Sequence, residues 1–168
     1  YKSPLLMKAI ILFFAIILCI QVHAAETGDS LIAALKNSPE DTNKVNILIS
    51  LSKHFLSSNP SEAIHYGEQA KGLAQKLNYH YGLAQAYKRL GLVYYMQGNY
   101  LQTLDYWDKS LEEFRKIKDQ SGEANIINNI GTVYFDQTDE TKALEYFLKS
   151  LKISENLKDT VRISTALC

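Results

Sequence analysis

Residues 81–120 read YGLAQAYKRLGLVYYMQGNYLQTLDYWDKSLEEFRKIKDQ, and residues 121–160 read SGEANIINNIGTVYFDQTDETKALEYFLKSLKISENLKDT. Laid over each other without a gap, the two stretches share thirteen identical residues, so the chain has a 40-residue period that carries Gly91 onto Gly131. A repeat of this length is typical of a solenoid, in which stacked units share one continuous core. Solenoids usually offer a binding surface rather than a reaction site. The repeat therefore indicates the architecture more clearly than the partner.

The bulk composition is that of an ordinary globular protein. The chain has 168 residues, of which 46% are apolar and 21% charged, and its formal net charge is zero. Proteins that bind nucleic acid normally carry a basic excess, so we expect no nucleic-acid partner. Cys19 and Cys168 are the only cysteines, and such a pair provides neither a disulfide framework nor paired zinc ligands.

Residues 1–24 have the pattern of a secretory signal peptide preceded by a short upstream extension. Lys8 supplies a positive charge, the stretch Ala9–Val22 carries none, and Val22-His23-Ala24 ends in a small residue. We expect cleavage after Ala24 and export to a periplasmic or other extracytoplasmic location. Any membrane contact would come through this leader or through a segment downstream of the sequence.

Two alternatives to a cleaved leader stay open. An uncleaved membrane anchor is the first, although a spanning helix needs about 18 or more apolar residues. A lipoprotein is the second, but Leu18 before Cys19 is not the small residue that lipid attachment prefers.

Beyond the leader, apolar residues recur at spacings of three and four, which is the helical period. Residues 25–40 should form a linker and a short helix capped by Asp29 or Ser30. The fold class is therefore all-α, an α-solenoid of stacked helix-turn-helix units. The predicted units are residues 41–80 (degenerate), 81–120 and 121–160, with residues 161–168 as the start of a truncated fourth.

Helix caps and glycines recur at the same period. Asn59, Asn99 and Asp139 can each cap the second helix of a pair through a side-chain oxygen. Gly91 and Gly131 lie inside first helices, where glycine costs about 1 kcal/mol relative to alanine. Their repetition predicts that the missing side chain lets the second helix approach closely.

The repeated residues resemble the tetratricopeptide repeat family. That family has a large apolar residue, Leu-Gly and Tyr in the first helix, then Ala, an aromatic residue and Ala in the second. The degenerate first unit places His54 at the tyrosine position, so we expect His54 to be partly buried. The matching residues are Tyr87, Leu90-Gly91, Tyr94, Thr103, Trp107 and Ser110; then Ile127, Ile130-Gly131, Tyr134, Ala143, Phe147 and Ser150; and, in the first unit, Ile47, Ser50-Leu51, His54, Ala63, Gly67 and Ala70.

The unit is longer than the common one of about 34 residues. It looks like the long, 40-residue subclass in exported, Bacteroidetes-like tetratricopeptide proteins. That resemblance implies that a transmembrane helix and an output module can follow the repeats: a histidine kinase, a nucleotide cyclase or a transcriptional regulator. We expect the sequence to be a fragment of a longer protein.

No residue pattern typical of an enzyme is present. The glycines do not form a phosphate-binding loop, and His54, His65 and His80 lack the i, i+4 spacing of metal ligands. Adjacent acids such as Glu112 and Glu113 point apart on a helix. The sequence predicts a non-catalytic segment without cofactor or metal.

The resemblance implies a right-handed superhelix with a concave face lined by first helices. Amide, hydroxyl and aromatic side chains there suit an extended peptide or a protein segment. Lys88, Asn129 and Arg162 also match part of the carboxylate clamp of some family members, but Leu92 and Ala166 stand where that clamp needs polar groups. The candidate partner-binding residues are Gln85, Lys88, Leu92, Tyr95, Asn125, Asn128, Asn129, Thr132 and Phe135, and the same phase of the first unit gives Val45, Leu48, Ser52 and Phe55.

The sequence thus predicts a protein–protein interaction module. The alternative is the extracytoplasmic sensor region of a longer membrane signalling protein with its output domain beyond Cys168. A structural role, in which the array packs on later repeats or on a second copy, is a third hypothesis.

Overall fold

The computed structural model describes residues 28–157, and within this range all regular secondary structure is helical. The chain divides into two compact parts, an N-terminal part of residues 1–38 and a C-terminal part of residues 39–168. The leader, Arg162, Ala166 and the truncated fourth unit lie outside the described residues. Within the described part, no helix combines the length and the apolar character that a membrane span requires.

In the N-terminal part, residues 28–37 form one helix. Gly28 is already helical, so Asp29 and Ser30 lie inside this helix and the prediction that one of them caps it is wrong. A capping residue stands outside the helical backbone, and neither residue does. The helix ends at Asn37, and Ser38 Oγ donates a hydrogen bond of 2.7 Å to Ala34 O.

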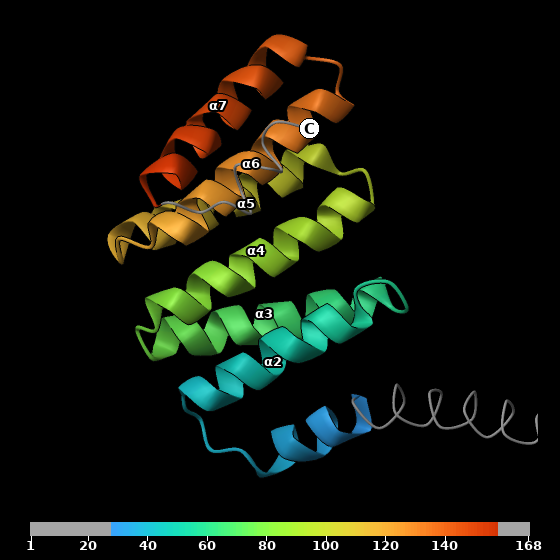
Figure 1. Ribbon diagram of the computed structural model, residues 1–168. Helices are drawn as coiled ribbons and strands as arrows, with labels where there is room; N and C mark the ends of the chain where they lie inside the picture. Colours follow the sequence, from blue (N-terminus) through green and yellow to red (C-terminus); the bar gives the residue numbers. More distant parts are fainter. Residues whose placement is uncertain (1–27, 158–168) are drawn as a thin grey trace, which may run out of the picture. The chain divides into compact units, whose positions relative to one another are not determined.

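Residues 39–157 contain six helices in three pairs, and Figure 1 shows successive helices running back and forth beside one another. Each helix contacts the next, and α2 also contacts α4. The all-α solenoid is therefore confirmed, whereas the right-handed sense of its superhelix stays a prediction. The helices are α2 (Thr42–Phe55), α3 (Pro60–Lys76), α4 (His80–Met96), α5 (Tyr100–Lys116), α6 (Gln120–Asp136) and α7 (Glu140–Asn156).

From α3 onward the backbone geometry repeats at half the sequence period, because helices of 17 residues alternate with turns of three. The middle residue of each turn ends the preceding helix with a left-handed backbone. These residues are Asn78 (φ 51°), Gly98 (φ 72°), Lys118 (φ 56°) and Thr138 (φ 61°). Turns within a pair and between pairs therefore share one geometry, and one sequence repeat contains two such helix–turn steps.

The predicted caps are confirmed. The side chains of Asn59, Asn99 and Asp139 each accept a hydrogen bond from the backbone N–H three residues later, at 3.1–3.3 Å. Asp119 caps α6 in the same way at 2.9 Å. These bonds satisfy backbone donors that would otherwise have no partner in the first helical turn.

The glycine prediction is also confirmed. A Cβ atom on Gly91 would lie 2.3 Å from Trp107 Cδ1, and one on Gly131 would lie 2.8 Å from Phe147 Cδ1. The same seam is hydrogen-bonded, since Ser110 Oγ donates to Ala84 O at 2.8 Å. An equivalent bond of 2.8 Å joins Ser150 and Ala124 one period later.

The first helix of the first pair, α2, departs from the predicted register by one residue. Leu48 is 2% exposed, whereas Ile47 is half-buried and His54 is exposed. Phe55 stacks on Tyr66 with ring centroids 5.7 Å apart, as Tyr94 stacks on Tyr106 at 5.4 Å. The core of α2 thus aligns with the core of α4 at a spacing one residue shorter than the sequence period. Leu48 matches Tyr87, Leu51-Ser52 matches Leu90-Gly91, and Phe55 matches Tyr94.

The physical reason is a shorter connection between the last core aromatic residue of the helix and the cap of the next helix. Phe55 stands four residues before the cap Asn59, whereas Tyr94 stands five residues before Asn99, and the described turn after α2 has no left-handed residue. The prediction that His54 is partly buried at the tyrosine position is therefore wrong. The assignment of four α2 residues to the concave face is wrong as well, because three of them are buried and Phe55 stacks on α3: Val45, Leu48, Ser52 and Phe55.

Candidate partner-binding surfaces

The nine candidate residues lie on α4 and α6. Eight of them are half-buried, and Phe135 is 60% exposed. With the corrected spacing, α2 contributes Asn46, Ile49 and Lys53 at the same phase. The first-helix face, as defined here, consists of Asn46, Ile49, Lys53, Gln85, Lys88, Arg89, Leu92, Tyr95, Asn125, Asn128, Asn129, Thr132 and Phe135.

A hydrogen bond joins α4 to α6 at the C-terminal ends of both helices. The Tyr95 hydroxyl donates to Asp136 Oδ2 at 2.6 Å, and this bond, with a smaller effect of burial, raises the pKa of Tyr95 to about 12. The ring of Tyr95 lies 5.7 Å from that of Trp107 and 6.1 Å from that of Tyr100. The sequence prediction missed Asp136, although it follows Phe135 directly.

Two amides on this face are incompletely bonded. The side-chain oxygens of Asn125 and Asn128 are buried and have no hydrogen-bond partner within residues 28–157. A buried acceptor without a donor costs about 1–3 kcal/mol, which a ligand supplying an N–H group would recover. Both residues were candidates from the sequence alone.

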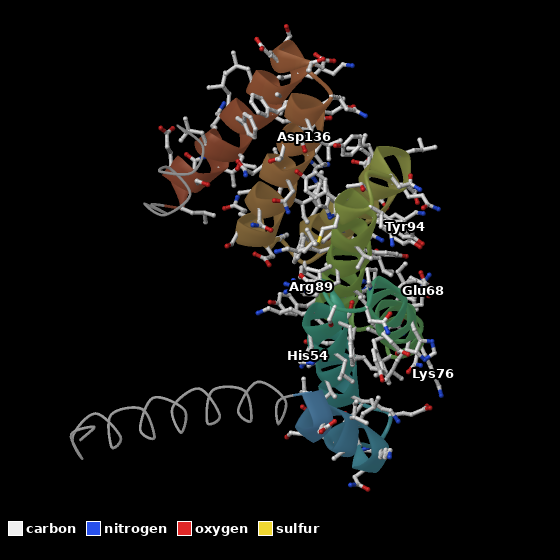
Figure 2. The ribbon with its side chains drawn as sticks, turned by 90° about the vertical axis from the view of Figure 1, so that its right-hand side faces the viewer. His54, Glu68, Lys76, Arg89, Tyr94 and Asp136 are labelled. Carbon is white, nitrogen blue, oxygen red and sulfur yellow. The ribbon has the colours of Figure 1, made fainter. Side chains whose placement is uncertain are left out.

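Arg89 was not a candidate, although it occupies the phase of Asn129 one period earlier. Its Nε is buried without a hydrogen-bond partner in the described part of the chain, and burial lowers the pKa of the guanidinium. Figure 2 shows Arg89 on one side of the stacked helices, with Glu68, Lys76 and Tyr94 on the opposite side. Arg89 thus places a half-buried cation on the first-helix face.

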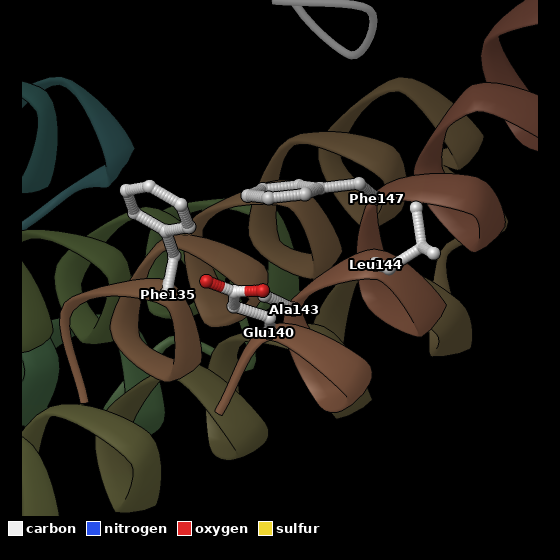
Figure 3. Close-up of a pocket in the computed structure, with 5 residues that line it drawn as sticks. All are labelled: Phe135, Glu140, Ala143, Leu144 and Phe147. Atoms are coloured by element: carbon white, nitrogen blue, oxygen red, sulfur yellow. The ribbon is translucent and has the colours of Figure 1, made fainter. Parts of the chain in front are cut away.

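A separate apolar pocket of about 290 Å³ opens between α6 and α7. Figure 3 shows the rings of Phe135 and Phe147 flanking it. Leu144 at its edge is 59% exposed, and Leu148 nearby is 55% exposed. The pocket is lined by Phe135, Glu140, Ala143, Leu144 and Phe147.

The repeat shows what fills the same place one unit earlier. The equivalent residues there are Tyr95, Leu104 and Trp107, which belong to or pack against the core cluster that includes Ile126, Ile127 and Ile130 of α6. The last turn of α6, at Asp136, reaches Tyr95. The pocket thus has the geometry of a socket for the last turn of another first helix. Among the candidates from the sequence, only Phe135 lines it.

The most buried acid, Glu113, forms a structural bridge. His80 Nδ1 lies 2.7 Å from Glu113 Oε2, and Lys116 Nζ donates to Oε1 at 2.5 Å. Burial of Glu113 opposes its ionisation, but the bonds from Lys116 and His80 outweigh that effect and lower the pKa of the carboxyl. Within residues 28–157, no group of three His, Cys, Asp or Glu side chains could hold a metal ion.

Residues 82–156 match the family model described as tetratricopeptide repeat. This segment therefore consists of tetratricopeptide repeats, whereas the 40-residue subclass and the Bacteroidetes-like origin stay predictions. No curated protein matches the sequence.

Solved structures with the same fold are similar along most of the chain. Aspartyl phosphate phosphatase F from Bacillus subtilis matches 74% of this chain and 33% of its own, with a TM-score of 0.71 and 16% identity. A signal transduction ATPase of Pyrococcus horikoshii with a tetratricopeptide repeat sensor matches 91% and 24%, with a TM-score of 0.77 and 22% identity. A Rap protein complexed with Competence and Sporulation Factor matches 85% and 40%, with a TM-score of 0.76 and 17% identity.

At these identities the likeness establishes the fold alone. The chain spans only 24–40% of the length of these three proteins.

Proposed function

We propose that this chain is a non-catalytic interaction module that binds a peptide or protein segment on its first-helix face. The observation that carries the proposal is the pair of buried, unbonded amide oxygens of Asn125 and Asn128 on α6. They stand about one helical turn apart on the same face of α6, the spacing at which two side chains can contact one bound segment.

Two further features support a binding role. The face mixes polar and apolar side chains, which is the usual composition of an interface that forms and dissociates. The Rap structure holds a bound factor in a protein of the same fold, although the low identity transfers no site to this chain.

Selection from a random peptide library displayed on phage tests the proposal. Peptides selected on the full chain should lose capture when Asn125→Ala and Asn128→Ala are combined. Gln69→Ala is the matched control, because it removes an exposed amide on α3, where the side chain bonds only to His65 in the described structure. Equal capture by all three proteins would remove the first-helix face from the function.

A second candidate function is the sensor region of a longer membrane signalling protein. The favouring observation is the leader pattern of residues 1–24 joined to a repeat array, and a relative by fold carries its repeats as a sensor. Export and cleavage after Ala24 belong to the same proposal. Expression with a C-terminal alkaline phosphatase fusion, followed by N-terminal sequencing, tests them; an inactive fusion with an intact leader would contradict export.

A further inference from the structure

One side of α7 carries a ridge of exposed side chains spaced four residues apart. The ridge begins with an acid, continues with two leucines and ends with a base. Leu144 is 59% exposed and Leu148 is 55% exposed, although both are large apolar residues. Side chains four residues apart form one continuous ridge along a helix. The α7 ridge, as defined here, consists of Glu140, Leu144, Leu148 and Lys152.

The two charged ends of the α7 ridge have no partner of opposite charge within residues 28–157. Elsewhere on the same helix, Lys149 pairs with Glu145 at 2.5 Å. Glu140 and Lys152 are both exposed, and neither forms such an ion pair in the described part of the chain. One negative and one positive charge therefore flank the two leucines, at opposite ends of the ridge.

The preceding units show that the stacking of repeats does not explain Leu148. One period earlier this position holds Asp108, and two periods earlier it holds Glu68. Asp108 is exposed even though the next first helix, α6, packs against α5. Leu144, in contrast, repeats the half-buried Leu104. A following first helix would therefore cover Leu144 and leave Leu148 in water.

The apolar surface extends from the α7 ridge into the neighbouring pocket. Leu144 lines this pocket as well, together with the rings of Phe135 and Phe147 (Figure 3). A single exposed leucine is ordinary on a protein surface, whereas a continuous apolar patch with a polar rim is typical of an interaction site. The two leucines and the pocket form such a patch, and Glu140 and Lys152 stand at its rim.

We propose that two copies of this chain associate through the α7 ridge, with the two α7 helices antiparallel about a two-fold axis. The order of the ridge favours a second copy as the occupant, because an antiparallel copy presents base, leucine, leucine and acid to acid, leucine, leucine and base. Glu140 of each copy then faces Lys152 of the other. Leu144 faces Leu148 at the edge of the pocket. A two-fold interface repeats every contact, so this arrangement forms two ion pairs and two leucine pairs. Ridges of this spacing run side by side when two helices pack.

No like charges meet in this register. Glu155, which also forms no ion pair within the described residues, falls opposite the neutral Gln137 in the turn before α7. One helix pair covers much less area than a typical stable interface of about 1,600 Å², so we expect a reversible dimer that forms at micromolar protein concentration. The α7 ridge contains no residue of the first-helix face, so this inference goes beyond the proposed function and does not depend on it.

Sedimentation equilibrium of the full chain over a range of protein concentrations measures the association. We expect monomers and dimers in an equilibrium that shifts toward the dimer as concentration rises. Leu148→Glu sets a carboxylate against Leu144 of the other copy and should abolish the dimer. Leu101→Glu is the matched control, because Leu101 on α5 is 83% exposed and lies outside the ridge, so this variant should associate as wild type does. A dimer that persists in Leu148→Glu would overturn the proposal. A wild-type chain that is monomeric at every concentration would also overturn it and leave the ridge to a helix of another protein.

Charge reversal tests the antiparallel register. Glu140→Lys and Lys152→Glu should each weaken dimerisation by about tenfold or more, because each change turns two attractive pairs into two repulsive ones. The first variant has two bases on its ridge and the second has two acids, so an equimolar mixture of the two should associate about as tightly as wild type. The double variant should recover in the same way, since its ridge complements itself again. Unchanged dimerisation in both single variants, or a loss that neither the mixture nor the double variant restores, would overturn the proposal.

Discussion

Tyr95 and Asp136 join two successive first helices, because the tyrosine hydroxyl on α4 donates a 2.6 Å hydrogen bond to a carboxylate oxygen on α6. One period after Tyr95 the chain has Phe135, which has no hydroxyl. Its ring instead lines the open pocket beside α7. The same position of the repeat thus forms a hydrogen bond between helices in one unit and lines an apolar pocket in the next.

Tyr95→Phe removes this link and keeps the aromatic packing against Trp107. We expect the free energy of unfolding to fall by about 0.5–1.5 kcal/mol, the usual net contribution of one hydrogen bond, and nearer the lower figure because Tyr95 is partly exposed. Urea unfolding measures the change. Tyr134→Phe is the control, since the ring of Tyr134 stacks on Tyr146 at 5.3 Å and stays in place; equal losses in both variants would argue against the link.

The pKa of Tyr95 defines the pH range of the same bond. A tyrosine titrates near ~10 in an unfolded chain, and Tyr95 titrates at about 12 in the folded protein. The fold favours the protonated hydroxyl, so its contribution is complete below pH ~10 and is lost as pH rises through the folded pKa. The stability difference between wild type and Tyr95→Phe should therefore shrink across this range, and a constant difference would contradict the assignment.

Gly91→Ala should destabilise the array. A Cβ atom at this position would lie 2.3 Å from Trp107 Cδ1, and overpacking of this kind typically costs about 1–3 kcal/mol. Gly72→Ala is the matched control inside α3, because nothing lies within 4 Å of its Cβ position. There the better helix propensity of alanine should stabilise the protein by up to about 1 kcal/mol. Thermal melting should therefore shift in opposite directions; two shifts of the same sign would be incompatible with the seam.

Glu113→Gln should destabilise the protein near neutral pH by about 1–3 kcal/mol, because it removes charged hydrogen bonds from a side chain that is 8% exposed. The pKa of Glu113 is lowered in the fold, so the stabilisation is present above the unfolded pKa and is lost as pH falls through the folded one. Wild type should thus lose stability on acidification more steeply than Glu113→Gln. Glu145→Gln, at an exposed pair on α7, should have the slope of wild type.

Features that depend on local backbone chemistry could be predicted from the sequence. The caps at Asn99 and Asp139 follow from side-chain oxygens placed before helical runs, and the close approach at Gly91 follows from a costly glycine repeated in phase. Each is decided within a few residues of the chain, so the sequence repeat was sufficient to locate it.

Features that depend on three-dimensional neighbours could not be predicted. The bond between Tyr95 and Asp136 breaks the period by one residue, so the alignment of repeats gave no signal for it. From the sequence, Arg89 could not be distinguished from its cationic neighbour Lys88. The lack of a hydrogen-bond partner for Arg89 Nε within the described residues depends on which side chains surround it in the fold. The register of α2 depends on one residue that is missing between Phe55 and the cap Asn59, and a gapless comparison at the full sequence period conceals this deletion.

Adjacent substitutions in α2 test that register. Leu48 is 2% exposed, so Leu48→Ala should cost about 2–5 kcal/mol through lost burial and the cavity that remains. Ile47 is half-buried at the neighbouring phase, and Ile47→Ala should cost no more than about 1 kcal/mol because part of its surface stays in water. Urea unfolding of both variants gives the comparison directly. The gapless alignment would place Ile47 in the core instead, so a larger loss for Ile47→Ala than for Leu48→Ala would restore that alignment and return His54 to the tyrosine position.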